Sequence, residues 1–384
     1  MAKQRVGIIG GGQLAWMLAQ EAPKLGLTVI VQTPQGDDPA VRSAQGSVFA
    51  AIASAQGTAQ LAQHCDVITF ENEFVDLAAL QSLADQGVEF CPSLAALAPL
   101  LDKYDQRCYL QSLGLPVPTF QLYQPETPLP LDYPFVLKAC RHGYDGQGTQ
   151  IIHSAQALKD LAPSLAGQPW LMEAYIPFER ELAVMAARNA QGEIVVYPVT
   201  ETYQQNQVCQ WTTTPAAIAL DLQAKAADYA RQLLTALDFV GIMGIECFLT
   251  PAGDLLINEI APRTHNSGHY TLDACATSQF AMQLQAVTGQ PLSSPELICP
   301  QAIMVNLLGY ETTQGDYLEK RQQLAALPHT QVHWYEKQVI RPGRKLGHVT
   351  VLLPGEQLLP ESDLKAIIQE INQIWYPQGH FERT

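Results

Sequence analysis

Two apolar segments on either side of a short turn carry carboxylates where apolar strands usually carry none. Glu246 lies inside the run 244–250, Glu259 lies near the end of the run 254–260, and Pro251–Gly253 separates the runs. A hairpin about this turn places the two carboxylates roughly opposite each other. Charges inside apolar strands are costly unless they are paired or bound to a metal. The pattern favours magnesium, which is held by one or two carboxylates and substrate phosphates, and a buried salt bridge is the alternative.

The first hundred residues alternate short apolar segments with amphipathic ones. The apolar segments have the length of strands, and the amphipathic ones have the period of helices. This alternation predicts an open parallel sheet up to about Pro99. The predicted strands are 6–9, 27–31 and 67–70, and the predicted helices are 13–24 and 76–86.

A glycine-rich loop, Gly10–Gly12, follows the first predicted strand. Such a loop lets backbone amides approach a ligand, as in dinucleotide-binding proteins. Those proteins also carry an acidic residue for ribose at the end of the second strand, where this chain has Gln32. We therefore prefer a loop that packs on the sheet, or binds another ligand, to an NAD-binding loop.

A second glycine-rich loop, 143–148, follows a predicted strand that contains Lys138. It is not a Walker A loop, because it lacks the Gly-Lys-Ser/Thr ending and leads into a strand. Backbone amides of a glycine-rich hairpin still suit an anion, and the lysine adds a positive charge. An ordinary flexible hairpin explains the loop equally well.

Two further glutamates, Glu173 and Glu181, lie at junctions between predicted strands and a loop. A carboxylate in such a place is able to accept a hydrogen bond from a ribose hydroxyl. A solvated charge at a sheet edge is the simpler explanation of each residue by itself.

Two segments in the second half of the chain concentrate cations and hydrogen-bond donors. The segment 261–269 combines an arginine, two histidines, an asparagine and a serine directly after the carboxylate pair. The segment 334–348 places four cations within nine residues, Lys337 to Lys345. Both segments suit an anion site, and solvated surface is the alternative for the second.

Composition excludes several classes of protein. The chain has 384 residues, of which 47% are hydrophobic and 15% charged, so it is long enough for two to four domains with large cores. The net charge of −15 argues against a nucleic-acid partner. Eight dispersed cysteines without a C-x-x-C pair predict reduced thiols and a cytoplasmic location. We expect neither a signal peptide nor a membrane span.

These motifs together resemble the ATP-grasp superfamily, and within it the family of 5-(carboxyamino)imidazole ribonucleotide synthases. The ordered combination of the second glycine loop, Asn258–Arg263, His265–His269 and Pro342–His348 is the most specific part of the resemblance. Other carboxylate–amine ligases share the earlier motifs but not the last. The remaining segments that match are Gly10–Leu14, Phe70–Asp76, Gly244–Phe248 and Trp334–Arg341.

The resemblance implies an α/β chain with an ATP-grasp fold. It implies a Rossmann-like, biotin-carboxylase-type parallel-sheet domain at the N-terminus and a small β-rich extension at the C-terminus. ATP is expected between the second and third domains. The expected domains are 1–99, a lid domain 100–178 with the glycine loop, a large domain 179–298 with the magnesium site, and an extension 299–384.

The resemblance also implies a role for individual residues. Glu246 and Glu259 are expected to bind Mg²⁺, and Asp145, Arg263 and Lys337 to take part in catalysis. The expected ATP contacts are Lys103, Lys138, Gly143, Tyr144, Asp145, Gly146, Gln147, Gly148, Thr149, Glu173, Ala174, Tyr175, Ile176, Glu181, Gln204, Asn258 and Glu259. The expected contacts of 5-aminoimidazole ribonucleotide are Glu73, Tyr144, Asp145, Arg263, His265, Asn266, Ser267, Lys337, Arg344 and Lys345.

Three positions depart from the family pattern. Gln147 replaces the usual basic residue of the glycine loop, Gln204 replaces a histidine near the nucleotide, and Trp16 replaces an arginine. None of these changes removes an expected metal ligand, so we expect an active enzyme.

The family mechanism begins with attack of bicarbonate on the γ-phosphate of ATP to give carboxyphosphate. Carboxyphosphate, or carbon dioxide released from it, then carboxylates the exocyclic amine of the ribonucleotide, in purine biosynthesis, with the glycine loop closed as a lid. A homodimer is expected from the family. The alternatives are another ATP-grasp ligase, such as a formate-using glycinamide ribonucleotide enzyme, and a nucleotide-binding protein without turnover.

Overall fold

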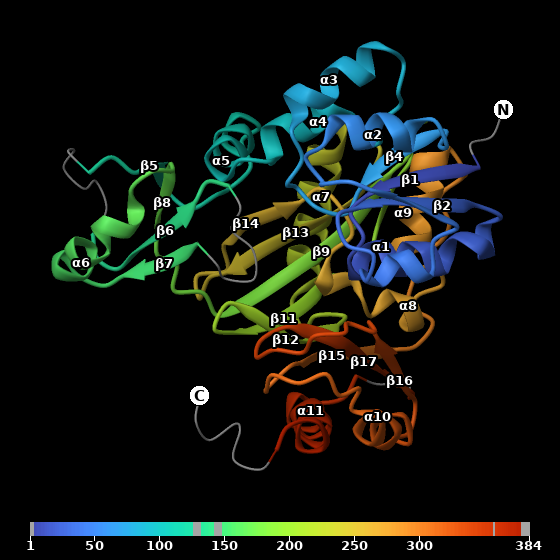
Figure 1. The fold of residues 1–384 in the computed structure, drawn as a ribbon. Helices are drawn as coiled ribbons and strands as arrows, with labels where there is room; N and C mark the ends of the chain where they lie inside the picture. The colour runs from blue at the N-terminus through green and yellow to red at the C-terminus, as the bar shows by residue number, and fades with distance from the viewer. Residues whose placement is uncertain (1–3, 126–131, 142–147, 356–357, 378–384) are drawn as a thin grey trace.

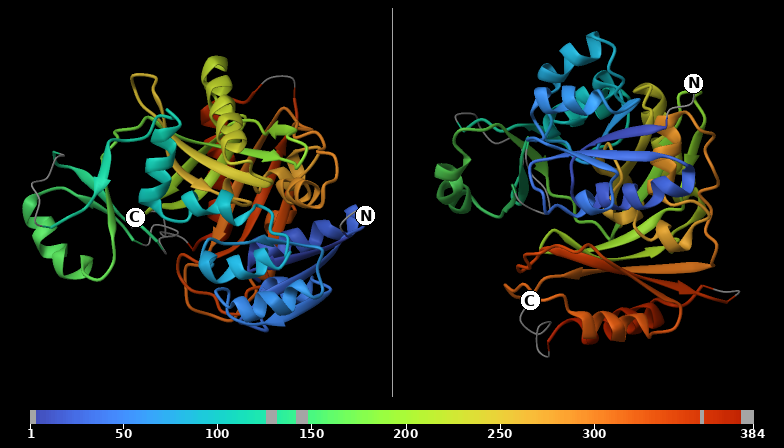
Figure 2. Two further views of the ribbon diagram at one scale, coloured as in Figure 1. Left: turned by 90° about the horizontal axis from the view of Figure 1, so that it is seen from above. Right: turned by 45° about the vertical axis from the view of Figure 1, so that its right-hand side comes forward.

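The computed structural model describes residues 4–125, 132–141, 148–355 and 358–377. Within these residues the strands form three sheets. One sheet is built from the N-terminal segment, a small sheet stands apart from the rest, and a long sheet runs through the middle and C-terminal parts of the chain (Figures 1 and 2).

The N-terminal sheet is parallel throughout, with the strand order β3-β2-β1-β4. The parallel α/β arrangement predicted for this segment is therefore confirmed. Its inner strands are largely buried because both faces are covered, as is usual for parallel sheets. The strands are β1 (Arg5–Ile9), β2 (Thr28–Thr33), β3 (Gly46–Phe49) and β4 (Val67–Phe70). The helices are α1 (Gln13–Glu21), α2 (Ala55–Ala62), α3 (Leu77–Asp85) and α4 (Leu94–Leu97), with 3₁₀ turns at Ala22–Leu25, Pro39–Arg42 and Ala98–Leu100.

The small sheet is antiparallel, with the order β5-β8-β6-β7. Alternate residues of β6, such as Phe135 and Leu137, are fully buried in a core of their own beneath α6. The register of β6 with β8 places Lys138 and Glu173 on the opposite face. The elements are α5 (Lys103–Ser112), β5 (Phe120–Leu122), β6 (Phe135–Ala139), β7 (Thr149–Ile152), α6 (Ala155–Leu165) and β8 (Trp170–Ala174).

The long sheet follows the order β14-β13-β9-β11-β12-β15-β17-β16, with β10 added beside β9. The C-terminal strands therefore continue the same sheet, since β15 pairs antiparallel with β12. Helices α10 (Leu318–Ala325) and α11 (Glu361–Trp375) cover one face of this C-terminal part (Figure 1). The strands are β9 (Arg180–Arg188), β10 (Ile194–Val196), β11 (Thr200–Gln205), β12 (Val208–Thr214), β13 (Gly241–Leu249), β14 (Leu255–Ala261), β15 (Gln301–Leu308), β16 (Thr330–Trp334) and β17 (Lys345–Leu353).

A helix between the N-terminal and long sheets is buried along its whole length. This helix, α9 (Gln279–Thr288), packs against α1 on one side and β13 on the other. The sequence predicts one helix over 271–288, but the chain forms α8 (Thr271–Ala274) and then α9. The break is stabilised by Ser278, whose hydroxyl accepts from the amide of Ala281. The remaining helix is α7 (Leu220–Ala236).

None of the helices in the described ranges is long and apolar enough to cross a membrane.

Candidate active site

A polar cavity of about 820 Å³ lies where the three sheets meet. Its wall combines the loop after β1, the start of α5, the start of β7, the hairpin β13–β14 and the segment before β17. Residues separated by more than 300 positions thus face one space. The predicted site residues that line it are Glu73, Lys103, Thr149, Gln204, Glu246, Glu259, Arg263, His265, Asn266, Lys337, Arg344 and Lys345.

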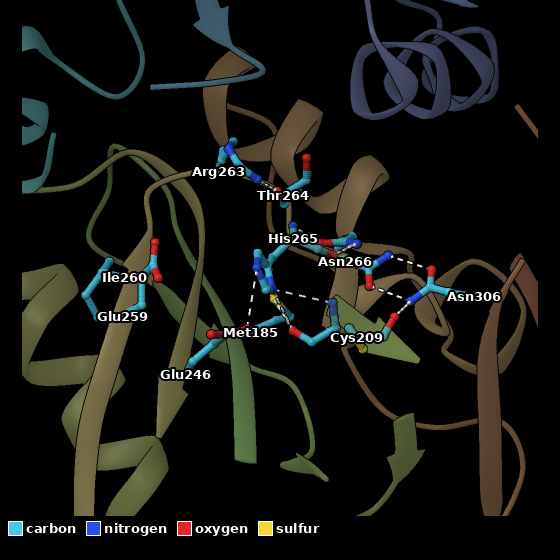
Figure 3. A network of polar contacts seen from close by, with 12 residues as sticks. Met185, Cys209, Glu246, Glu259, Ile260, Arg263, Thr264, His265, Asn266 and Asn306 are labelled. Carbon is cyan, nitrogen blue, oxygen red and sulfur yellow. Dashed lines mark hydrogen bonds and ion pairs between the residues drawn. The ribbon is translucent and has the colours of Figure 1, made fainter. Parts of the chain in front are cut away.

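The carboxylate pair lies at one end of this cavity. Glu246 on β13 and Glu259 on β14 are direct cross-strand partners, as the hairpin pattern predicts. A bulge follows Glu246, and the turn residue Gly253 has a φ of +85°, a conformation that favours glycine. Figure 3 shows both carboxylates beside the imidazole of His265, which approaches Glu246 Oε1 to 3.7 Å.

The two carboxylates have different electrostatic surroundings. Burial, together with the nearby charges of Glu259 and Glu181, raises the pKa of Glu246 to about 8. Burial also disfavours the charged form of Glu259, but Lys103 lies 2.5 Å from its Oε1 and holds its pKa at about 2. Burial raises the pKa of Glu181 to about 7. Lys103 therefore stabilises the charged form of Glu259, and a cation bound beside Glu246 would likewise favour the charged form of that carboxyl group.

The carboxylate pair combines both alternatives of the sequence: Glu259 forms a salt bridge with Lys103, and Glu246 faces it with oxygen atoms of the kind that bind a divalent cation, so magnesium binding stays a prediction. Glu246 and Glu259 face each other with hard oxygen ligands, and the one ammonium ion pair recorded at the pair, within the described residues, is that of Lys103 with Glu259. The Glu259 side chain is 42% exposed to the cavity, so a hydrated ion is able to reach it.

A buried group of ion pairs joins β6, β8 and α5 and contacts Asn258 on β14. Glu173 on β8 accepts from Arg107 on α5 and lies 2.7 Å from the ammonium of Lys138. Lys138 also donates to the side chain of Asn258 at 2.9 Å, and Arg107 donates to the Asn258 carbonyl. Burial disfavours the Glu173 carboxylate, yet the two cations lower its pKa to about 2.

This arrangement changes the physical interpretation of Glu173. Its side chain is only 2% exposed and does not line the cavity, because both oxygens are engaged by cations. The sequence did not indicate Arg107, since its partner lies 66 residues away on another element. Ala174, Tyr175 and Ile176 follow Glu173 at the end of β8, and Glu181 begins the inner part of β9. Their contacts with ATP stay predictions.

Another part of the cavity wall is rich in cations. Arg263 forms an ion pair with Glu73, 2.8 Å apart, and the guanidinium of Arg344 donates to the Val339 carbonyl. Lys337 donates to the Gln13 side chain and to the Lys345 carbonyl, each at 2.7 Å.

The loop between β14 and α8 is held rigidly beside these cations. His265 and Ser267 are joined by a 2.9 Å hydrogen bond between their side chains. The buried amide of Asn266 forms two hydrogen bonds with Asn306 on β15, as Figure 3 shows. The C-terminal extension thus fixes the orientation of a loop in the large domain. Ser267 is buried and does not line the cavity.

Five predicted residues lie outside the described residues: Gly143, Tyr144, Asp145, Gly146 and Gln147. Gly148, with a φ of +83°, and Thr149 follow them as the chain enters β7.

The N-terminal glycine loop binds a carboxylate that no local sequence pattern indicates. The buried carboxylate of Glu71, which follows β4, accepts from the amides of Gly12, Leu14 and Ala15 at 2.7, 3.1 and 3.3 Å. The loop amides therefore bind a carboxylate of the chain itself. Gln32 is fully buried and donates to the Ala51 carbonyl, which agrees with the preference against an NAD site.

A second acid–histidine group, Asp273, His333 and His348, lies where α8 meets β16 and β17. His333 and Asp273 are 2.9 Å apart, but the rings of His333 and His348 are stacked at 4.5 Å with an angle of 14° between their planes. In two nearly parallel stacked rings, the nitrogen lone pairs point along parallel planes and do not converge on one point. A zinc ion needs each nitrogen at about 2.1 Å, so this geometry suits packing better than coordination.

Comparison with known proteins agrees with this geometry. Family models match the chain in three consecutive parts: a ribonucleotide synthetase preATP-grasp domain over residues 2–99, an ATP-grasp domain over 108–280, and a phosphoribosylaminoimidazole carboxylase C-terminal domain over 302–359. The N5-carboxyaminoimidazole ribonucleotide synthase of Synechocystis sp. is 57% identical over 381 residues, covering 97% of this chain and 98% of the relative. The chain belongs to the N5-carboxyaminoimidazole ribonucleotide synthase family.

Solved structures of N5-carboxyaminoimidazole ribonucleotide synthases share the complete fold. An ADP complex of one such synthetase has a TM-score of 0.88 and 32% identity, covering 98% of this chain and 97% of the other. The Aspergillus clavatus enzyme, solved with ADP and 5-aminoimidazole ribonucleotide, has a TM-score of 0.87 and 30% identity, covering 97% and 98%. The predicted ATP-grasp fold with an N-terminal parallel sheet and a C-terminal extension is thereby confirmed. The predicted domain limits and residue roles stay predictions.

Proposed function

We propose that this chain catalyses the ATP- and bicarbonate-dependent carboxylation of the exocyclic amine of 5-aminoimidazole ribonucleotide, a step of purine biosynthesis. One observation supports this most directly: a single cavity joins the carboxylate pair to a separate cluster of cations. An enzyme that couples ATP to a second phosphorylated substrate needs both kinds of surface.

The carboxylate end suits the phosphates of ATP. Magnesium bound there by Glu246 and Glu259 would neutralise charge on the phosphates during transfer. Lys103 reaches the cavity with its ammonium held by Glu259, and Lys138 is held nearby by Asn258. Lys103 would bind a phosphate oxygen without the reorganisation that water requires, whereas Lys138 is paired with Glu173 and does not line the cavity, so its contact with ATP stays a prediction.

The first chemical step forms carboxyphosphate. An oxygen of bicarbonate attacks the γ-phosphorus, the bond to the bridging oxygen breaks, and ADP leaves with its electron pair. The residues of this chain align the two anions and offset their repulsion, which is the main contribution a protein makes to phosphoryl transfer.

The cationic end suits the ribonucleotide. We assign its phosphate to Arg344 and Lys345, and its ring and amine to Arg263, His265, Asn266 and Lys337, with Glu73 holding Arg263. The amine nitrogen then attacks the carboxyl carbon of carboxyphosphate, or carbon dioxide released from it. Phosphate leaves and the amine loses a proton, for which Asp145 remains our candidate acceptor.

Phosphate release measured with each substrate omitted in turn tests this function. We expect release to require bicarbonate and to rise when 5-aminoimidazole ribonucleotide is added. Formate replaces bicarbonate in a parallel reaction, because a formate-using ATP-grasp ligase is the nearest alternative. Equal phosphate release with formate would overturn the proposed function.

The predicted homodimer and the cytoplasmic location stay predictions. The eight cysteines lie in the described residues and are all free thiols, as the sequence analysis expects. Sedimentation equilibrium over a range of concentrations would measure the oligomeric state.

A further inference from the structure

The ammonium of Lys337 is held by a residue from the opposite end of the sequence. Its Nζ donates to Gln13 Oε1 at 2.7 Å and to the Lys345 carbonyl at 2.7 Å. It also lies 5.5 Å from the centre of the Tyr335 ring, whose face attracts cations. A lysine head group on a four-carbon stem has many rotamers, so two fixed acceptors narrow its position considerably.

Gln13 is itself fixed because the loop that carries it is bound to Glu71. The carboxylate of Glu71 accepts from the amides on both sides of Gln13, those of Gly12 and Leu14. The approach is so close that a Cβ at Gly10 or Gly12 would lie 2.4 to 2.5 Å from a Glu71 oxygen. The glycines of this loop thus serve the contact with Glu71, which takes the position that a bound anion would occupy.

We propose that Gln13 is a positioning residue for the ribonucleotide site. It holds the Lys337 ammonium at the cavity wall, and Glu71 locks Gln13 in place through the loop 10–15. The inference rests on the proposed function, because it gives Lys337 a task in binding and orienting the ribonucleotide. It adds a contact from the N-terminal domain to a lysine of the C-terminal extension.

Steady-state kinetics on Gln13→Met test this inference, since methionine keeps the length of the side chain but has no strong acceptor. A hydrogen bond to a charged group contributes about 1.5–3 kcal/mol, so kcat/KM for the ribonucleotide should fall roughly 10- to 150-fold. The KM for ATP should stay within about twofold, because the phosphate end does not contact Gln13. Gln13→Glu keeps an acceptor for Lys337 and should recover most of the loss.

Gln20→Met is a matched control on the same helix, because Gln20 is exposed and lies away from the cavity. If Gln13→Met fails to fold, Gln13→Asn replaces it, because its amide is one methylene too short to reach Lys337.

A double-mutant cycle separates positioning from a general structural effect. If Gln13 acts through Lys337, Gln13→Met should have little further effect in a Lys337→Met background. Equal losses in both backgrounds would overturn the inference, as would a parallel rise of both Michaelis constants in Gln13→Met alone. A different result would overturn the proposed function itself: a wild-type chain whose turnover does not depend on the ribonucleotide.

Discussion

At the scale of single residues, the cavity wall depends on two kinds of contact, one within a hairpin and one between segments that are far apart in the sequence. Glu246 and Glu259 were predictable because each lies in an apolar strand and a short turn joins the strands. Arg107, Glu71 and Gln13 were not, because their partners lie 66, 57 and 324 residues away. No local spacing indicates such contacts, since the fold alone brings the partners together.

Glu259 should act on turnover more than on binding. In Glu259→Gln we expect kcat to fall by about 100-fold or more, because the carboxylate that would hold the metal ion is lost, and with it the positive charge that offsets the phosphate charges in the transition state. Phosphate release at saturating ATP and magnesium measures this effect. Glu179→Gln, a change at an exposed carboxylate, is the control. A near-normal kcat in Glu259→Gln would contradict the assignment of this residue to the metal.

Glu173 should stabilise the fold in a manner that depends on pH. Its pKa is about 2 in the folded chain and near 4.5 in the unfolded one, so its contribution is complete above about pH 4.5 and is lost as pH falls towards 2. The shift of about 2.5 units corresponds to roughly 3 kcal/mol. We expect Glu173→Gln to lower the melting temperature by several degrees at pH 7, and the difference from wild type to shrink at pH 3.

Calorimetry at the two pH values, with Glu179→Gln as the exposed control, measures this difference. A gap between wild type and Glu173→Gln that stays constant with pH would show that the carboxylate charge is not what stabilises the fold.

At the scale of elements, strands were predicted best where an apolar run ends at a turn or a glycine. The predicted bounds of β4, 67–70, agree with the structure, because they follow from a local apolar run. The order of strands in the long sheet was not predictable, since pairing depends on contacts between distant segments. The sequence predicts a β-rich C-terminal extension but does not indicate that β15 joins β12.

The contact between β13 and the loop 262–269, which follows β14, is so close that one added methyl group tests it. A Cβ at Gly244 would lie 2.8 Å from the Cβ of His265, which is fixed to the backbone and has to move. We expect Gly244→Ala to lower kcat/KM for the ribonucleotide about 10-fold and to destabilise the chain by about 1–3 kcal/mol. Gly46→Ala in β3 is the matched control, because its Cβ would meet Ile30 at an ordinary 3.6 Å.

Steady-state kinetics and thermal melts compare kcat/KM for the ribonucleotide and the stability of Gly244→Ala with those of Gly46→Ala. If the two variants behave alike, the loop 262–269 does not depend on close packing against β13.

At the scale of the whole molecule, the C-terminal extension is part of the core. All eight residues of β15 are buried, and the strand lies between β12 and β17. A chain that ends at residue 299 would expose the edge of β12 and the apolar face that β15 covers. We expect this chain to aggregate or to melt without cooperativity, as measured by circular dichroism and size-exclusion chromatography.

A chain that ends at residue 377 is the control and should melt like the full chain. A well-folded monomer from the chain that ends at residue 299 would show that the extension is an independent domain.

The continuity of the long sheet also bears on how such an enzyme changes its substrate over evolution. Glu246 and Lys345 lie on strands of one hydrogen-bonded sheet, whereas the other cations assigned to the ribonucleotide lie on the segments after β14 and before β17. Residues on the segment before β17 are therefore able to change without altering the hairpin that carries Glu246 and Glu259. Enzymes built on this long sheet are thus able to acquire new acceptor substrates through substitutions near β15 and β17, while the proposed ATP and metal site is retained.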